Sequence, residues 1–213
     1  MAGSRQLAGI EVLDTPIVRG AIDYAREQCE DYLFNHAMRS WLFAARLGQL
    51  RSQDHDAEVV AVSTLLHDIT LNDRFAGPRR FEVEAADIAR KFALEAGMGE
   101  RRSQQIWDGV ALNSTPSIGL HKEAEVSLCT AGVCLDVVGL QFDALTSDEV
   151  ASVVREFPRL DMKKRMTKCF CHIALTVPET TYDNFVRDFG QRFIAGYDPP
   201  SAVEWVASAP FEE

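Results

Sequence analysis

The fold of this chain is decided by LLHDI at residues 65–69, where a histidine and an aspartate end an apolar segment. The apolar periodicity predicts a helix that begins after Asp54, the expected N-cap, and runs to His67 and Asp68. Burying an unpaired carboxylate costs at least ~1–3 kcal/mol, which a metal ion would offset. Taken alone, such a His-Asp pair more often contacts an arginine or solvent, so other residues must show whether His67 and Asp68 bind a metal.

Two distant residues favour the metal. His36 lies in FNHAMRS at residues 34–40, near the start of an apolar helix, and Asp136 interrupts VCLDVV at residues 133–138, where a carboxylate needs a partner. Two imidazoles and two carboxylates on different helices suit Zn²⁺, Fe²⁺ or Mn²⁺. Helix bundles commonly build such sites from facing helices.

Helical periodicity also dominates the rest of the chain, and no convincing strand is predicted. We expect an all-α protein with a single domain over residues 1–213, whose core covers about 15–197 between two tails. The other helices are expected at 16–30, 34–50, 81–96, 100–113, 122–140, 148–156, 161–175 and 182–194, with a loop at 71–80.

The composition narrows the classes of partner. A net charge of −10 repels phosphate backbones and anionic lipid, so we expect no nucleic-acid partner and no membrane partner. No apolar stretch approaches the roughly 20 residues of a membrane span, and MAGSRQLAGIEVLDTP at the N-terminus lacks the apolar run of a secretory signal. We therefore expect a cytoplasmic protein.

The five cysteines do not suggest a disulfide framework, because their number is odd and the chain is long. We expect free and mostly buried thiols. CFCH at residues 169–172 could be drawn as a metal cluster, but a CxC on an apolar helix splays its thiols around the axis. We interpret these thiols as core residues.

The order of His36, the His67-Asp68 pair and Asp136 resembles the HD superfamily of metal-dependent hydrolases. The flanking segments are similar to the cyanamide hydratase branch of that superfamily. Beside the three stretches already quoted, they are RFEV at residues 80–83 with Ala85 and Ala86, AGVCLDVVG at 131–139 and TYDNF at 181–185, so the resemblance spans most of residues 15–197.

The resemblance implies a single HD-domain helical bundle that holds one zinc ion, while the ligand chemistry also allows iron or manganese. It assigns the metal to His36, His67, Asp68 and Asp136. Members of the hydratase branch add water to the nitrile of cyanamide and give urea. Many other HD proteins hydrolyse phosphoesters, some of them with two metals.

One position departs from the family pattern: Asn113 stands where related sequences often have a histidine. An amide is a weaker ligand than imidazole, so this departure argues against a second metal site and leaves the substrate open. Asn113 could instead hydrogen-bond the substrate. Arg39 is a second candidate contact, with a structural ion pair as the equal alternative, and Phe81 and Glu82 could shape the pocket mouth.

The hypothesis that follows is a hydratase acting on a small-molecule substrate. A metal-bound hydroxide would attack a nitrile-type carbon, and Asp68 would move the proton to nitrogen. An HD phosphohydrolase acting on a nucleotide or another small phosphate ester is the first alternative. A non-catalytic metal-binding module is the second, and a homo-oligomer stays open.

Overall fold

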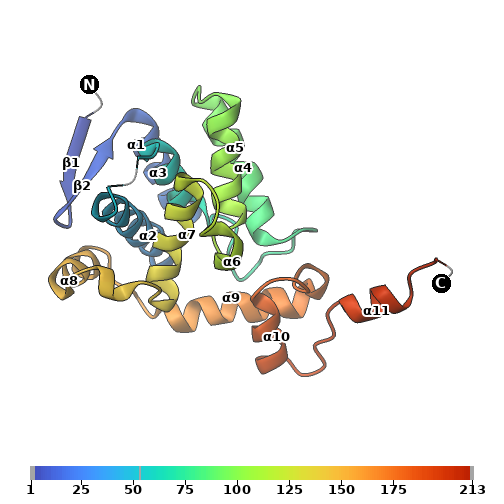
Figure 1. The fold of residues 1–213 in the computed structure, drawn as a ribbon. Helices are drawn as coiled ribbons and strands as arrows, with labels where there is room; N and C mark the ends of the chain where they lie inside the picture. The colour runs from blue at the N-terminus through green and yellow to red at the C-terminus, as the bar shows by residue number, and fades with distance from the viewer. Residues whose placement is uncertain (1–2, 53, 212–213) are drawn as a thin grey trace. The chain divides into compact units, whose positions relative to one another are not determined.

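A computed structural model describes residues 3–52 and 54–211 of the chain, and helices make up most of it (Figure 1). This confirms the all-α prediction. The helices are α1 (Pro16–Gln28), α2 (Asp31–Leu50), α3 (Ala57–Leu66), α4 (Phe81–Glu95), α5 (Glu100–Ala111), α6 (Pro116–Gly119), α7 (Ala124–Val138), α8 (Ser147–Glu156), α9 (Met162–Thr176), α10 (Val186–Phe193) and α11 (Ala202–Ala207), with short 3-10 turns η1 (Phe142–Ala144) and η2 (Pro178–Thr180).

The chain divides into two compact units, and the prediction of a single domain stays a prediction. The first unit runs to Thr70 and continues over Phe81–Met162, so it contains all four residues of the expected metal site. The second combines Leu71–Arg80 with the chain from Lys163 onward. In the second unit Phe170 packs against Phe185 and Phe189, and each pair of ring centroids is 4.8 Å apart.

The expectation of no strand is wrong at the N-terminus. Strands β1 (Gly3–Leu7) and β2 (Ile10–Asp14) form an antiparallel hairpin in which Leu7 pairs with Ile10. The two residues of its turn, Ala8 and Gly9, both have positive φ (50° and 83°), which suits a tight hairpin of two twisted strands. The alternation in β2, with Ile10 and Val12 buried around an exposed Glu11, was the available signal.

Helix α3 lies at the centre of the first unit, because every residue from Val59 to Leu66 is buried. A helix that is apolar on all sides must be surrounded by protein, and α1, α2, α5 and α7 all contact it. The polar residues that follow its last turn therefore enter the interior rather than solvent. His67 is fully buried and Asp68 is 4% exposed.

The start of α3 differs from the prediction, because Asp56 and not Asp54 is its N-cap. The Asp56 carboxylate accepts hydrogen bonds from the amides of Glu58 and Val59. Arg102 of α5 donates to both of its oxygens, at 2.7 and 3.0 Å. Asp54 lies two residues too early to reach these amides and is exposed. The cap thus also ties α5 to the start of the central helix.

We expect Asp56→Ala to lower the free energy of unfolding by about 1–2 kcal/mol at pH 7, since it removes a cap. Partial burial raises the pKa of Asp56, but hydrogen bonds from Arg102 and the backbone outweigh it and lower the pKa below its usual value. The contribution is therefore present above a pH of about 4 and is lost as pH falls through the lowered pKa. Urea denaturation at several pH values measures the loss of unfolding free energy and its pH dependence. Asp54→Ala is the control and should leave the free energy of unfolding nearly unchanged.

Helices α2 and α7 pack closely at Gly132 of α7, and this contact places the two halves of the site. A Cβ at Gly132 would collide with the Ser40 carbonyl oxygen and lie 2.7 Å from the Ala44 Cβ, both on α2. Only a glycine allows backbones this close. Gly132 is four residues before Asp136, and Ser40 is four residues after His36, so the close approach holds these two side chains at the same crossing.

Gly132→Ala should therefore destabilise the first unit by about 1–3 kcal/mol, in spite of the better helix propensity of alanine. Gly20→Ala is the matched control, because its Cβ would meet the Phe92 ring at an ordinary 3.6 Å. We expect that control to be neutral or stabilised by up to about 1 kcal/mol. Thermal unfolding of both variants measures the difference, and equal effects would contradict the steric argument.

The other helix bounds follow the predictions to within a few residues, with three exceptions. The short helices α6 and α11 were not expected, and the helix predicted at 182–194 is present only as Val186–Phe193. α7 ends at Gly139, whose φ of 75° is the left-handed conformation that commonly closes a helix. Among the helices of the described residues, none has the length and apolar character needed to span a bilayer.

Candidate metal centre

The end of α3 positions the His67-Asp68 pair. His67 is the C-cap of α3, with φ −63° and ψ −30°, and Asp68 follows in the turn. The Nδ1 of His67 lies 2.8 Å from the carbonyl oxygen of Thr64. A carbonyl can only accept, so Nδ1 carries the hydrogen and Nε2 is left with its lone pair in the neutral ring.

His36 is held in the same way on α2. Its Nδ1 lies 2.7 Å from the Oδ2 of Asp136 on α7. An ionised carboxylate only accepts hydrogen bonds, so Nδ1 is again the donor and Nε2 carries the lone pair. Both imidazoles are fully buried, and in each the backbone or a carboxylate sets the tautomer.

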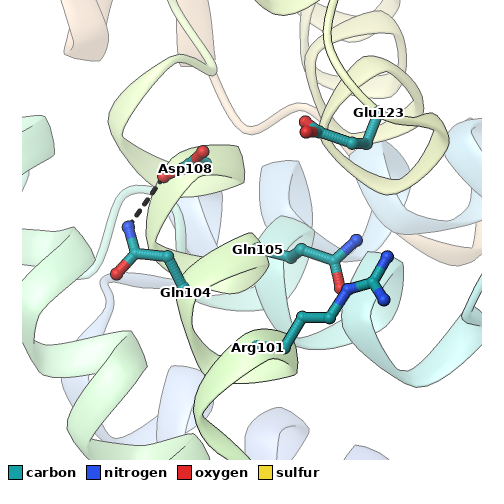
Figure 2. A pocket seen from close by; sticks show the side chains of 5 residues that line it. All are labelled: Arg101, Gln104, Gln105, Asp108 and Glu123. Atoms are coloured by element: carbon teal, nitrogen blue, oxygen red, sulfur yellow. Dashed lines mark hydrogen bonds between the residues drawn. The ribbon is translucent and has the colours of Figure 1, made fainter.

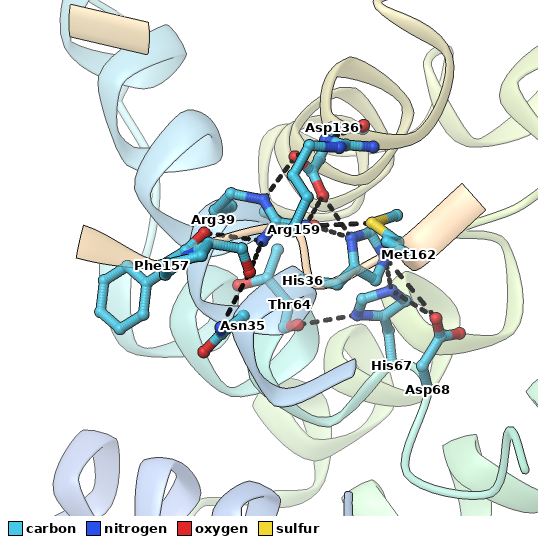
Figure 3. Close-up of polar contacts among 12 residues, drawn as sticks. Asn35, His36, Arg39, Thr64, His67, Asp68, Asp136, Phe157, Arg159 and Met162 are labelled. Atoms are coloured by element: carbon cyan, nitrogen blue, oxygen red, sulfur yellow. Dashed lines mark hydrogen bonds and ion pairs between the residues drawn. The ribbon is translucent and has the colours of Figure 1, made fainter. Parts of the chain in front are cut away.

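The two free nitrogens and one carboxylate oxygen meet at one point. His36 Nε2 lies 3.0 Å from His67 Nε2, and Asp68 Oδ2 lies 3.6 and 3.2 Å from these two atoms. Figure 3 shows the three side chains pointing toward one another. Within the described part of the chain, they form the group of donors that could hold a metal ion.

The chemistry of these donors fits a divalent metal. Two lone pairs that face each other at 3.0 Å repel unless a proton or a cation lies between them. Two imidazole nitrogens and a carboxylate oxygen are borderline and hard ligands, the mixture that Zn²⁺, Fe²⁺ and Mn²⁺ accept. Each histidine also donates its other nitrogen to an oxygen, as metal-bound histidines almost always do.

Charge interactions shift the titration of the group. Burial lowers the pKa of His36 below its usual value. Burial also acts to lower the pKa of His67, but the charge and hydrogen bond of Asp68, together with the Thr64 carbonyl and the charge of Asp136, outweigh it, and the pKa of His67 is raised. Burial raises the pKa of Asp68, yet the adjacent His67 holds it lower than usual. A cation bound among the three groups would favour the deprotonated imidazoles and the ionised carboxylate.

Asp136 lies at the other edge of the His36 ring, where two arginines hold it. Arg39 donates Nε to Oδ1 and an Nη to Oδ2, both at 2.8 Å, and Arg159 donates to Oδ1 at 2.9 Å. Burial raises the pKa of Asp136, but the hydrogen bonds from His36 and Arg39 reverse this and lower it far below its usual value. Asp136 is therefore an anion in the interior. Its assignment as a direct metal ligand stays a prediction.

Arg39 is buried and its guanidinium is fully used. Besides Asp136, it donates to the carbonyl oxygens of Phe157 at 2.8 Å and Pro158 at 3.3 Å, and it lies 3.0 Å from the Met162 sulfur. These contacts favour the structural ion pair, the alternative to a substrate contact. To bind substrate, Arg39 would have to leave one of these partners.

The other two expected substrate contacts lie at the ends of helices. Phe81 is the buried first residue of α4, and its carbonyl oxygen accepts from Thr70, two residues after Asp68. Asn113 is buried just after α5, where its amide donates to the carbonyl oxygen of Val110 at 2.6 Å. The roles of both in substrate binding stay predictions.

Two further residues belong to this region, and of these only Arg159 was not foreseen from the sequence. Arg159 completes the clamp on Asp136, and Glu82, fully buried at the start of α4, accepts from Ser114 at 2.6 Å. Glu82 carried a readable signal, because it adjoins an apolar helical face next to Phe81. Arg159 carried none, since it lies in a turn 23 residues from its partner.

The cysteine thiols do not take part in the proposed metal site. All five cysteines are free, and three of them are buried, as predicted. Burial raises the pKa of Cys134 to about 11, so its thiol is a poor nucleophile at neutral pH.

A surface pocket of about 240 Å³ lies beside α5. It is lined by the polar side chains of Arg101, Gln104, Gln105, Asp108 and Glu123 (Figure 2). None of these is a candidate ligand of the metal group.

Comparison with known proteins supports the resemblance at a distance. No family model matches the chain. Two proteins of Saccharomyces cerevisiae (strain ATCC 204508 / S288c), the cyanamide hydratases DDI2 and DDI3, are each 27% identical to it, over 72% of this chain and 69% of each relative. The chain that holds the His36, His67 and Asp68 group is thus similar to curated cyanamide hydratases.

Proposed function

We propose that this protein is a metal-dependent hydratase that adds water to a small nitrile-like substrate, with cyanamide as the first to test. One observation carries the proposal: Nε2 of His36, Nε2 of His67 and Oδ2 of Asp68 converge in the interior, with both imidazole tautomers set to present lone pairs. The names of the two yeast relatives supply the reaction class. Zinc is the metal that we propose, before iron or manganese.

The residues would divide the work as follows. A divalent ion, when bound, supplies a Lewis acid that lowers the pKa of coordinated water from 15.7 to about 7. His36, His67 and Asp68 hold it. Asp68 directs one oxygen, Oδ2, at both imidazoles. To its other oxygen we assign the transfer of a proton from the attacking water to the substrate nitrogen. We keep Asn113 as the candidate hydrogen-bond donor to the substrate.

Two features favour a neutral substrate over a phosphate ester. The dianionic phosphate gains most from a second metal or from convergent cations. Arg39, the cation closest in sequence to a ligand, is buried and bound to Asp136 and to two backbone carbonyls. The net charge of −10 also disfavours a dianion in solution.

The test follows urea formation from cyanamide beside phosphate release from a panel of nucleotide monophosphates, with zinc-loaded protein. We expect urea formation, and loss of that activity in His67→Ala. Urea formation that is equal in both proteins would refute the site. Phosphate release that needs His67, without urea, would establish the phosphohydrolase alternative. Metal binding with neither reaction would refute the substrate class and leave the non-catalytic module.

A further inference from the structure

Asp136 contacts His36 on the edge of the ring that faces away from the metal group. Its Oδ2 lies 2.7 Å from Nδ1, whereas the lone pair that faces His67 and Asp68 is on Nε2. The two nitrogens of an imidazole point in different directions, so a carboxylate bound to one of them does not share the position of an ion bound to the other. In Figure 3, Asp136 and Asp68 lie on opposite sides of the two histidines.

The Asp136 carboxylate is also saturated with donors. Oδ2 accepts from His36 and Arg39, and Oδ1 accepts from Arg39 and Arg159, all at 2.7–2.9 Å. The two contacts from Arg39 are the bidentate geometry that fixes a carboxylate most firmly. A direct bond from Asp136 to a metal would have to replace one of these hydrogen bonds between buried, charged groups.

Two arginines connect this carboxylate to the turn after α8. Arg39 donates to the carbonyl oxygens of Phe157 and Pro158, and Asn35 donates to the latter at 2.9 Å. Arg159 donates to the Asp136 backbone oxygen at 3.1 Å as well as to its side chain. The turn therefore holds the same two helices, α2 and α7, that carry His36 and Asp136.

We propose that Asp136 orients His36 instead of binding the metal, and that Arg159 is a positioning residue that acts through Asp136. Arg39 and Arg159 hold the carboxylate, the carboxylate keeps the hydrogen on His36 Nδ1, and Nε2 is thereby presented as a ligand. The inference rests on the proposed metal site at His36, His67 and Asp68. It assigns the turn at 157–159 a role in setting the affinity for metal.

Arg159 allows a test that spares the core, because its side chain is 31% exposed while Asp136 is buried. In Arg159→Met, we expect zinc affinity, measured by competition with a chelating dye, to fall about 10-fold, the lower end of the range for groups that support a ligand. Arg159→Lys should restore part of this loss. Arg155→Met is the matched control, since Arg155 is an exposed arginine four residues earlier, and its affinity should stay within twofold. Equal affinities in the Arg159→Met and Arg155→Met variants would overturn the role of Arg159.

The tautomer of His36 provides a second measurement, which would not change if Arg159 had a purely structural role. We expect ¹⁵N spectra of the folded wild-type protein to show a protonated Nδ1, and the Arg159→Met variant to show a weaker Nδ1 hydrogen bond with unchanged circular dichroism. A wild-type spectrum in which His36 carries its hydrogen on Nε2 would contradict the proposal. Neither this spectrum nor zinc affinity requires turnover, so a failed hydratase assay leaves both results interpretable.

The role of Asp136 itself is tested by X-ray absorption spectroscopy at the zinc edge in the wild-type protein, and by the zinc affinity of the Asp136→Asn variant. In the wild-type protein we expect two imidazoles and one protein carboxylate at the ion. Asp136→Asn should still bind about one zinc per chain at saturating zinc, with its zinc affinity reduced about 10–100-fold. If Asp136→Asn unfolds, the wild-type spectrum decides alone. A second carboxylate at about 2.0–2.2 Å from zinc would make Asp136 a ligand and overturn the inference.

Discussion

His67→Ala is expected to lose most of the bound metal, from about one zinc ion per chain to a small fraction of that, because a three-donor protein site cannot spare an imidazole. His67 supplies one of the two lone pairs that face each other at 3.0 Å, and its own orientation is fixed by the Thr64 carbonyl. Elemental analysis of protein purified without chelators measures the loss.

The same variant should lose the stabilisation that metal provides. Zinc at 100 times its Kd raises the free energy of unfolding of the wild-type protein by about 2.7 kcal/mol, and this increment should vanish in His67→Ala. His121→Ala, at an exposed histidine, is the matched control and should keep both metal and increment. Cys171→Ser should also keep its metal. Unchanged zinc in His67→Ala would refute the ligand assignment, and zinc loss in Cys171→Ser would return attention to residues 169–172.

Asp68→Asn should lower kcat for hydration by about 10²–10⁴-fold at saturating zinc, the usual contribution of a positioned acid or base. An amide keeps one oxygen for the metal but cannot accept and release a proton. Asp68 is buried, and the adjacent His67 holds its pKa below the usual value, so the wild-type group is an anion.

Zinc content must be measured together with rate, because the asparagine is also a weaker ligand. Asp143→Asn, at an exposed aspartate in η1, is the matched control and should keep its full rate. If Asp68→Asn turned over at the wild-type rate with zinc bound, the proton-transfer role would pass to another residue.

The local sequence was sufficient to predict an element where a single segment contained all the residues that define it. The apolar run that ends at His67 predicted an apolar helix, and the structure has that helix as α3, buried from Val59 to Leu66. Errors occurred where two choices were close in local energy. Asp54 and Asp56 are both good N-caps, and only Asp56 also meets Arg102 of α5, 46 residues away. The hairpin at Ala8 and Gly9 was missed because a single two-residue turn is a weak signal without its packing partners.

By itself, the sequence determined that a histidine, a His-Asp pair and a distant aspartate each lie on an apolar helix and need partners, because an uncompensated carboxylate is costly to bury. Only the tertiary structure decided which partners they find. It directs Asp68 at the two Nε2 atoms and Asp136 at the far edge of His36, where Arg39 and Arg159 hold it. Periodicity reports which face of a helix is buried. The edge of an imidazole that a carboxylate 100 residues away will contact depends on how closely α2 and α7 cross, and Gly132 sets that approach.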